Sequence, residues 1–385
     1  MTSLDLFAGA GGMTLGFKDA GIRSIGAIEI DHFAAETFRH NFPDVPVYNR
    51  DVHGFKTAEI RRLFGGVDIV AGGPPCQGFS VAGPSQYGVI DERNTLVMEF
   101  FRFVKVLNPK YCILENVKGL LNGKMTAEKK ALETYLEELK KIGYKSKVYI
   151  LQAADFGVPQ YRERVVVLST RTGCSFPMKI VGGFEGEANW VKVSEAFGDL
   201  PLIEAGQGDN EMVPYAAPAR SKYQKYIRRG SKGVTNHVAM KHTPRLIARF
   251  AQIPQGGSLL DVAAEFGQRQ RNGTGLDVNK RYKTNNQRLH PGRISYIVTA
   301  SFQSTFVHPD LNRNLTAREG ARLQSFPDWF YFCGPRTLMS KKLLIKEHRE
   351  DEIGLSQYNQ IGNAVPPRMA YGIAKAVLEM DGGRE

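Results

Sequence analysis

The sequence predicts an α/β protein, in which a doubly wound, mostly parallel sheet is joined to a second, smaller domain of irregular structure. Three observations support this fold class. Over the first ~180 residues, short runs rich in β-branched residues alternate with helical patterns, as in a parallel sheet with helices on both faces. Beyond that point, glycine, proline and polar residues become frequent and the alternation ends. A length of 385 residues also suits two domains better than one.

The expected strands of the sheet are segments 3–7, 24–29, 45–49, 67–72, 111–116, 147–152 and 164–170. Helical patterns lie between them. The clearest covers 126–143, where Thr126 can cap the start and Gly143 can end the helix. A helical pattern returns in the C-terminal tail from Arg368.

We expect the first domain to combine residues 1–184 with 358–385, and the second domain to span 185–310. Residues 311–357 are expected to form a hinge or bracing segment between them. Its stretch LTAREGARLQSFP has helical spacing at Leu315, Ala321 and Leu323, which is typical of a packing helix. Further on, SKKLLIKEHRED is expected to form an extra charged helix.

Composition excludes several classes of protein. The chain is 42% hydrophobic and 23% charged, as soluble globular proteins are. Its apolar runs have the length of strands, so we expect no membrane span and no signal peptide. The four cysteines are far apart, which predicts neither a zinc site nor a disulfide framework. The expected setting is a reducing cytosol.

Positive charge is concentrated in one segment. Residues 218–293 contain 16 lysines and arginines but only three acids, which accounts for the whole net charge of +12. Such uneven charge favours a polyanionic partner, most simply nucleic acid. The alternative interpretation is a basic surface in contact with solvent.

The stretch DLFAGAGGMTLGF at 5–17 reads as a strand, a glycine turn and a helix. Glycines such as Gly9 and Gly11 allow a ligand to approach the backbone at the start of a helix. The dinucleotide fingerprint is not met, because Thr14 stands where its last glycine or alanine belongs. This mismatch argues against an NAD-dependent oxidoreductase. Taken alone, the glycine turn is only weak evidence for a ligand site.

Three acids strengthen the case for a ligand site. Asp5, Glu29 and Asp51 lie in or after the first three expected strands, whose carboxyl ends meet at one crevice. Glu29 is suited to accept hydrogen bonds from ribose hydroxyls, and Asp51 from an exocyclic amine. Phe7 and Ile30 are placed to sandwich a flat ring, so the predicted ligand resembles adenosine. Taken singly, each acid could instead be a helix cap or part of a salt bridge.

Cys76 follows the fourth expected strand, in the loop GGPPCQGFS, and opens onto the same edge. Prolines stiffen its approach, and its thiolate would be the reactive form. A structural cysteine is the usual alternative, but Cys112 with its apolar neighbours fits that description better. Glu115 ends the next strand, and Arg162 and Arg164 precede the last one. This group suggests nucleophilic activation of an electron-poor ring.

The order of these motifs resembles that of the DNA (cytosine-5)-methyltransferases. The matching pieces are DLFAGAGG (5–12), GGPPCQGFS (72–80), ENV (115–117), QYRER (160–164), LTAREGARLQSFP (315–327) and IGNAVPP (361–367). They stand in the family's order over nearly the whole chain. The resemblance implies a Rossmann-like methyltransferase fold, with S-adenosylmethionine as the methyl donor, S-adenosylhomocysteine as the product and no metal. Residues 185–310 would be the target-recognition domain.

The resemblance also assigns roles to residues. It implies a cofactor pocket formed by Asp5, Phe7, Gly9, Gly11, Gly12, Glu29, Ile30, Asp51, Val52, Pro75, Leu96, Asn363, Ala364 and Val365. Relatives often have an aromatic residue where this chain has Ile30, which should weaken adenine stacking. Cys76 would add to C6 of a cytosine swung out of the duplex. Glu115 would bind N3 and the amino group, Arg164 would hold O2, and Arg162 would support the site.

Duplex DNA is the implied partner. Ser80 and Arg93 are candidate phosphate contacts in a loop that would close over the flipped base, and the candidates in the second domain are Arg220, Lys222, Arg228, Arg229, Arg269 and Arg271. A monomer in the bacterial cytosol, at the chromosome, is expected, with a restriction endonuclease as a separate companion. Two alternatives stay open: a tRNA cytosine-5 methyltransferase of the same fold, and an inactive DNA-binding homologue.

Overall fold

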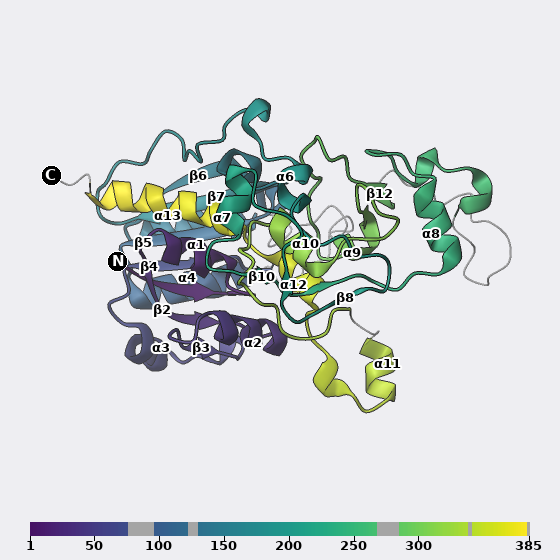
Figure 1. Cartoon of the computed structure of the whole chain (residues 1–385). Coiled ribbons are helices and arrows are strands. Elements are labelled where there is room, and N and C mark those ends of the chain that lie inside the picture. Colours follow the sequence, from purple (N-terminus) through teal and green to yellow (C-terminus); the bar gives the residue numbers. More distant parts are fainter. Residues whose placement is uncertain (76–95, 122–129, 268–284, 338–340, 383–385) are drawn as a thin grey trace. The chain divides into compact units, whose positions relative to one another are not determined.

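The computed structural model describes residues 1–75, 96–121, 130–267, 285–337 and 341–382 (Figure 1). Its contacts divide the chain into two units. The first unit comprises Met1–Phe156, Arg162–Gly186 and Ala364–Glu385, and the second comprises Gly157–Tyr161 and Glu187–Asn363. None of the helices in the described part of the chain is long and apolar enough to cross a bilayer.

The first unit is built on a seven-stranded sheet with the strand order β3-β2-β1-β4-β5-β7-β6. Its strands are β1 (Thr2–Leu6), β2 (Arg23–Ile28), β3 (Val47–Tyr48), β4 (Ile69–Gly72), β5 (Tyr111–Asn116), β6 (Lys145–Gln152) and β7 (Glu163–Thr170). The first five strands pair in parallel, whereas β7 is antiparallel to both β5 and β6. The mostly parallel, doubly wound sheet expected from the sequence is therefore confirmed.

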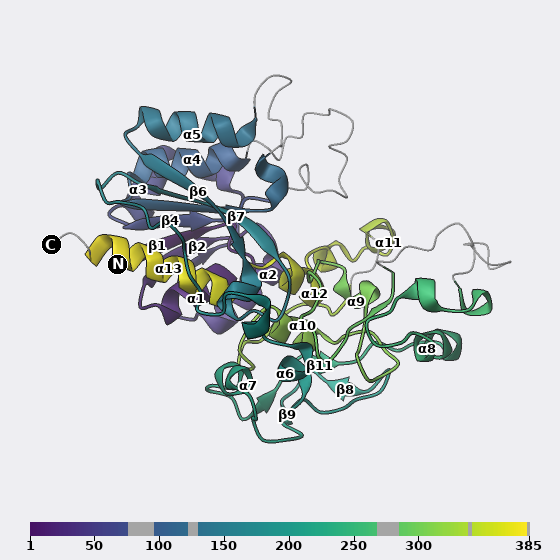
Figure 2. The ribbon, with the colours of Figure 1, turned by 90° about the horizontal axis from the view of Figure 1, so that it is seen from above.

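Helices cover both faces of this sheet (Figure 2). Its helices are α1 (Gly12–Asp19), α2 (His32–Asn41), α3 (Thr57–Phe64), α4 (Leu96–Leu107), α5 (Ala131–Lys141) and α13 (Pro367–Gly382). Helices α3, α4 and α5 lie on one face, and α1 and α13 pack together on the other. The expected start of α5 at Thr126 falls outside the described residues, and the described helix begins after Lys130. The predicted tail helix is confirmed as α13.

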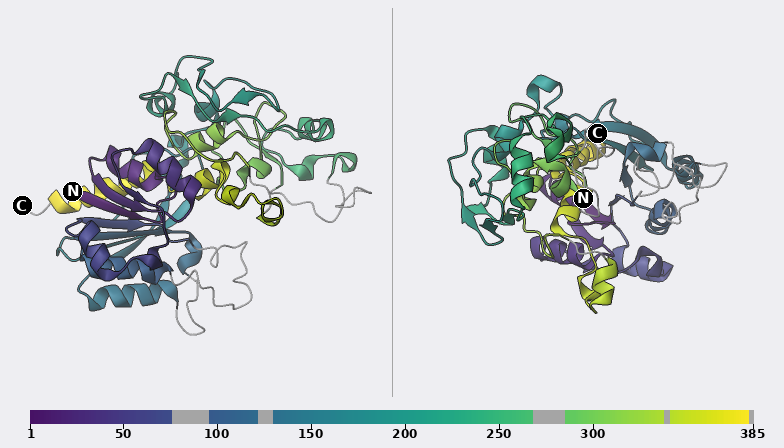
Figure 3. Two further views of the ribbon diagram at one scale, coloured as in Figure 1. Left: turned by 90° about the horizontal axis from the view of Figure 1, so that it is seen from below. Right: turned by 90° about the vertical axis from the view of Figure 1, so that its right-hand side faces the viewer.

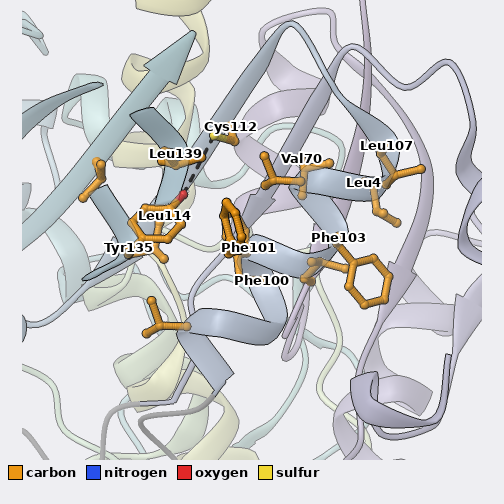
Figure 4. Close-up of a cluster of buried hydrophobic side chains, with 14 of the residues drawn as sticks. Leu4, Val70, Phe100, Phe101, Phe103, Leu107, Cys112, Leu114, Tyr135 and Leu139 are labelled. Atoms are coloured by element: carbon orange, nitrogen blue, oxygen red, sulfur yellow. Dashed lines mark hydrogen bonds between the residues drawn. The ribbon is translucent and has the colours of Figure 1, made fainter. Parts of the chain in front are cut away.

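Buried side chains between the sheet and α3–α5 form the main core of this unit (Figure 4). Leu4, Val70 and Leu114 from the strands meet Phe100 and other aromatic residues of α4. Cys112 is fully buried there, as expected for a structural cysteine, and accepts a hydrogen bond from the Tyr135 hydroxyl at 3.8 Å. Burial raises the pKa of the Cys112 thiol to about 12, so this cysteine is chemically inert.

The second unit consists mostly of long connecting segments with short helices and two-residue strands (Figure 3). Its strands are β8 (Gly208–Asp209), β9 (Val213–Pro214), β10 (Gly233–Val234), β11 (His237–Val238), β12 (Gln287–Arg288) and β13 (Phe306–Val307). Its helices are α6 (Val193–Phe197), α7 (Lys222–Ile227), α8 (Pro244–Ala251), α9 (Phe302–Thr305), α10 (Ala317–Leu323), α11 (Lys341–Lys346) and α12 (Gln357–Asn363). The irregular second unit agrees with the sequence.

Helix α10 lies at the centre of this unit and is buried along its whole length. Thr316 caps its start together with Glu319, which accepts a hydrogen bond from the Thr316 backbone N–H at 2.8 Å. Arg322 pairs with Asp199 and Asp328, while Arg313 forms a two-bond pair with Glu319. The predicted packing helix is thus confirmed: Leu315 and Leu323 are buried, and buried ion pairs of Arg313 and Arg322 also hold the helix. The expected charged helix at 340–351 is short, because α11 ends at Lys346.

Candidate active site

The ends of four neighbouring strands lie at the same level along one edge of the sheet. Leu6 at the end of β1 pairs with Ile28 of β2 and with Gly72 of β4, and Gly72 in turn pairs with Leu114 of β5. The residues that follow these strands must therefore emerge beside one another. Doubly wound sheets bind their ligands at this edge.

The glycine turn after β1 has an unusual backbone. Phe7, Gly9 and Gly11 all have positive φ angles, of 58°, 54° and 95°. A Cβ atom at Gly11 would lie 2.5 Å from the Phe42 ring, so only glycine fits at this position. A Cβ at Gly9 would meet nothing within 4 Å, because the turn faces open space there. The backbone is therefore accessible at the start of α1, where Gly12 is the first helical residue.

Glu29 is fixed in front of this turn. Its two carboxylate oxygens accept hydrogen bonds from the backbone N–H groups of Gly9, at 2.7 Å, and Asp31, at 2.8 Å. Burial raises the pKa of Glu29, and these two hydrogen bonds oppose that rise. Each oxygen still has a lone pair for a further donor. The arrangement therefore presents a preorganised bidentate acceptor at the strand edge.

The other two acids differ in their surroundings. Asp5 is buried below the turn and accepts a hydrogen bond from the Thr14 hydroxyl at 2.8 Å. Burial raises its pKa to about 7. Asp51 is exposed at the start of a short 3-10 helix (Val52–Gly54). Slight burial raises the pKa of Asp51, but the hydrogen bonds and charge of His53 outweigh this effect and lower it. The Asp51 carboxylate is thus accessible to a hydrogen-bond donor of a ligand. Asp5, in contrast, is buried beneath the glycine turn.

The apolar candidates also occupy this edge. Ile30 directly follows Glu29 and is 67% exposed, so it offers a free apolar surface. Phe7 is partly buried against the core. Val52 is buried, and its carbonyl accepts a hydrogen bond from Arg102 at 2.9 Å. Pro75 is exposed and Leu96, the first residue of α4, is half-buried.

Glu115 and Arg164 form a buried ion pair at the same edge. Arg164 Nε lies 3.0 Å from Glu115 Oε1, and each side chain is only 9% exposed. Burial is the largest influence on the pKa of Glu115 and raises it, while Arg164 and Arg162 oppose the rise. Burial also lowers the pKa of Arg164. The pair therefore combines a buried carboxyl group, whose pKa is raised by burial, with a buried guanidinium at a fixed distance.

Arg162 connects two parts of the first unit. Its Nη2 donates to the Ala364 carbonyl at 3.3 Å, and its backbone N–H donates to the Gln152 side chain at 2.7 Å. Burial and the like charge of Arg164 lower the pKa of its guanidinium. Val365, which follows Ala364, is half-buried. Asn363 is exposed and belongs to the second unit.

The approach to Cys76 is held against Glu115. Asn116 donates a hydrogen bond from Nδ2 to the Pro74 carbonyl at 3.1 Å. A Cβ atom at Gly73 would lie 3.1 Å from Glu115 Oε2, so a larger residue at this position would press on the carboxyl group. Cys76 itself lies outside the described residues, as do Ser80, Arg93, Arg269 and Arg271.

The remaining basic candidates fall into two groups. Arg220 and Lys222 are exposed at the start of α7. Arg228, in contrast, donates to Asp199 at 3.2 Å and to the Ala217 carbonyl at 2.9 Å, and its guanidinium lies 3.5 Å from the centre of the Tyr215 ring. Arg229 lies over Tyr226, at 4.2 Å from the ring centre. Arg228 is therefore already engaged within the unit.

Sequence reasoning missed the residues that hold the site in place. Thr14 fixes Asp5, Asn116 fixes Pro74, and the Asn49 side chain donates to the carbonyls of both Glu29 and Ile30 at 2.9 Å. Asp31 caps α2 through the Ala34 N–H while its own N–H holds Glu29. Signals existed for two of them, because Asn116 belongs to the ENV motif and Asp31 precedes a helical pattern.

Among the residues that the structure describes, no group of three His, Cys, Asp or Glu side chains could hold a metal ion.

Comparison with known proteins gives a consistent picture. A family model described as C-5 cytosine-specific DNA methylase matches residues 1–379. The type II methyltransferase M.DdeI of Desulfomicrobium norvegicum is 43% identical over 98% of this chain and 88% of its own length. The type II methyltransferase M1.HphI of Haemophilus parahaemolyticus is 35% identical over 99% of this chain and 87% of its own length.

Solved structures share the fold. A putative DNA modification methyltransferase of an Escherichia coli prophage superposes with a TM-score of 0.75, at 24% identity, over 99% of both chains. The DNMT2 of Spodoptera frugiperda superposes with a TM-score of 0.58, at 16% identity, over 98% of this chain and 99% of its own.

Proposed function

Because this chain belongs to the C-5 cytosine-specific DNA methylase family and is a DNA cytosine-5 methyltransferase, we propose that it methylates a flipped-out cytosine in a specific duplex sequence through a covalent bond from Cys76. The buried Glu115–Arg164 pair, fixed beside the chain that leads to Cys76, carries this proposal. A carboxyl group and a guanidinium at fixed distance match the donors and acceptors on one edge of cytosine.

In the proposed mechanism, the Cys76 thiolate forms a bond to C6 of the ring, and C5 thereby becomes nucleophilic. Glu115 donates its proton to N3 and accepts from the amino group, which the burial-raised pKa of this acid favours. Arg164 holds O2, and Arg162 keeps the pair aligned through its bond to Ala364. After methylation, C5 loses its proton to water and N3 returns its proton to Glu115, while the Cys76–C6 bond breaks and the thiolate is restored.

Glu29 and the glycine turn fit the adenosyl part of S-adenosylmethionine. A carboxylate held by two backbone N–H groups suits the two ribose hydroxyls. Asp51 with Val52 would take the adenine, and exposed Ile30 offers a surface for its ring. The segment Asn363–Val365, Pro75 and Leu96 would contact the methionine part. When bound, this cofactor supplies a methyl group activated by its positive sulfonium.

A covalent-trapping experiment tests the mechanism. A duplex substrate with 5-fluorocytosine at the target position should form a denaturation-resistant complex, because fluorine cannot leave C5 as a cation and Cys76 stays bound. The full-length chain with S-adenosylmethionine should therefore show a mass increase equal to the DNA strand plus the transferred methyl group, and the Cys76→Ala variant should show none. Trapping by the Cys76→Ala variant would refute the nucleophile.

The Cys112→Ala variant is the matched control, because Cys112 is buried and inert. It should trap the substrate as well as the unchanged protein does. Binding of S-adenosylhomocysteine, measured by calorimetry, should be equal in all three proteins. This separates loss of the nucleophile from loss of the fold.

The relatives named as type II methyltransferases support a role in restriction-modification, with a separate endonuclease that cuts the same sequence. The chain would work as a monomer at the bacterial chromosome, and residues 185–310 would recognise the target. Bisulfite sequencing of DNA from a methylation-free host that expresses the chain would identify the motif. If no cytosine is protected there, tRNA is the next substrate to test.

A further inference from the structure

The second unit contains a hollow that the proposed reaction does not use. Its volume is about 660 Å³, which lies within the range of small-molecule sites. The side chains that characterise it are Tyr161, Glu187, Trp190, Lys192, Arg293 and Tyr296. All of them belong to the second unit. None is among the residues assigned above to the methyl donor, the target cytosine or the DNA backbone.

Aromatic rings line the hollow and stay accessible. Tyr161 is 48% exposed and Tyr296 is 41% exposed. Trp190 meets Tyr161 edge to face, with 6.0 Å between ring centres. Tyr296 lies beside the buried ring of Phe306, with 6.4 Å between centres. These contacts fix the rings and leave open surface on which a flat ligand can stack.

Backbone hydrogen bonds hold the three wall segments together. The N–H of Tyr161 donates to the Ser295 carbonyl at 2.9 Å, and the N–H of Ser295 donates to Pro159 at 3.1 Å. On the other side, Val193 donates to the Arg293 carbonyl at 2.9 Å. The hollow is thus bordered by short ladders of backbone bonds, so its shape exists before any ligand arrives.

The charged residues specify the ligand further. Lys192 and Arg293 line the same hollow as the rings and are exposed, and Glu187 is the one acid among the six characteristic side chains. Aromatic faces with nearby cations are the recurring means of binding a nucleobase and its phosphate. A carboxylate beside them suits the hydroxyls of a sugar. An acidic peptide would use the cations but leave the rings without a partner.

We propose that this hollow is a second nucleotide site, which takes a nucleobase with its 5′-phosphate. The base stacks on Tyr161, Trp190 and Tyr296, and the phosphate is held by Lys192 and Arg293. Two sources can supply this chemistry, namely a free nucleotide or a nucleotide of the bound DNA. The site goes beyond the proposed methyl transfer, and only its second source, a nucleotide of the bound DNA, rests on the proposed function.

Trp190 provides the measurement. The chain has two tryptophans, so a Trp329→Phe variant of the full-length chain reports on Trp190 alone. Its fluorescence is followed during titration with adenosine 5′-monophosphate, with S-adenosylhomocysteine kept at a saturating concentration to occupy the Glu29 crevice. We expect saturable quenching by the monophosphate. A parallel titration uses duplex DNA in place of the free nucleotide.

Matched variants give the test its specificity. Lys192→Ala/Arg293→Ala should weaken binding of the monophosphate at least tenfold but leave adenosine almost unaffected, and Tyr161→Ala should weaken both. The controls are Lys342→Ala, an exposed lysine on α11, and Tyr371→Ala, a 41% exposed tyrosine on α13. Both should bind like the parent protein.

The outcomes decide between the two sources. Quenching by the free nucleotide that the double variant abolishes assigns the hollow to free nucleotides. Quenching by DNA alone, with the same sensitivity, assigns it to a nucleotide of the bound strand. If neither ligand quenches Trp190, or if the variants change nothing, the site is disproved. Methyl transfer and binding of S-adenosylhomocysteine are measured separately, so failure of this site stays distinct from failure of the proposed function.

Discussion

Arg164 Nε and Glu115 Oε1 lie 3.0 Å apart in a place that is almost closed to solvent. The two residues come from adjacent antiparallel strands, β5 and β7, so the backbone ladder fixes their separation. A buried carboxyl group and a buried guanidinium stabilise each other, and removal of either partner leaves an uncompensated group in a low dielectric. The pair is therefore expected to affect both stability and catalysis.

Arg164→Ala should lower the free energy of unfolding by about 3–5 kcal/mol, because it leaves the Glu115 carboxyl group buried without its partner. The double variant Arg164→Ala/Glu115→Ala should recover part of this loss, with a coupling energy of roughly 1–3 kcal/mol. Urea unfolding of the four proteins in the cycle measures both quantities. Additive losses would mean that the two side chains do not stabilise each other.

Glu115→Gln should lower kcat by about 10²–10⁴-fold while KM for DNA changes little. The amide can donate and accept in the same directions as the protonated acid, but it cannot give up a proton as N3 becomes more basic. Steady-state transfer of labelled methyl groups gives both constants. Glu163→Gln, at the half-buried first residue of β7, which pairs with Lys118, is the control and should retain activity. Equal losses in both variants would point to a general disturbance of the sheet at β5 and β7 rather than to loss of a proton donor.

Glu29→Gln should weaken S-adenosylhomocysteine binding by roughly 10–100-fold, because an amide has only one acceptor oxygen for two backbone donors and two ribose hydroxyls. Calorimetry measures the affinity directly. Glu36→Gln, on the exposed side of α2, serves as the control. An unchanged affinity in the Glu29 variant would remove this residue from the cofactor pocket.

Asp5 should make stability depend on pH. Its pKa rises from 3.8 to about 7 on folding, so the folded state binds the proton more tightly. Its stabilising contribution is complete below about pH 4 and is lost as the pH rises through 7. Compared with Asp5→Asn, the unchanged protein should lose roughly 2–4 kcal/mol of unfolding free energy between pH 4 and pH 8.

Asp68→Asn provides the opposite control for Asp5. Slight burial raises the pKa of Asp68, but Lys110 and Thr2 outweigh it and lower the pKa. Asp68 therefore stabilises the fold above its ordinary pKa and stops doing so as the pH falls. Urea midpoints measured across pH should show slopes of opposite sign for the two variants. Parallel slopes would contradict the assignment for Asp5.

Arg220 and Arg228 should respond differently to alanine. Arg220→Ala should reduce DNA affinity and lower the salt dependence of binding by about one counterion, since an exposed arginine can contact phosphate. Arg228→Ala should mainly destabilise the second unit, because it removes the bonds to Asp199 and Ala217 and the contact with Tyr215. DNA titrations at several salt concentrations, with thermal unfolding of each variant, distinguish the two effects.

Much of the first unit could be predicted from the sequence. All seven strands of the sheet lie at the short β-rich runs that alternate with helical patterns in the sequence. Glu29 and Glu115 lie at the edge of the sheet, as expected. Local signals were strong there, because buried parallel strands are continuous apolar runs. The positive φ of Phe7 was not predictable, since only glycine signals that conformation in a sequence.

The second unit was harder to predict. Arg313, Arg318 and Arg322 resemble surface residues in the sequence but are fully buried. Arg322 pairs with Asp199, which lies 123 residues earlier in the chain, so no local pattern announces that pairing. The same reason explains why Arg228 looked like a DNA contact. Only the capping pair Thr316 and Glu319 left a short-range signal.

The three buried arginines should affect how sensitive this protein is to different chemical denaturants. Guanidinium is chemically the head group of an arginine side chain, so it can take the place of Arg313 or Arg322 beside Glu319, Asp199 and Asp328. Urea carries no charge, so it cannot replace an arginine beside these carboxylates. The second unit should therefore be more sensitive to guanidinium than its size alone would suggest, and the order in which the two units unfold can reverse between the two reagents.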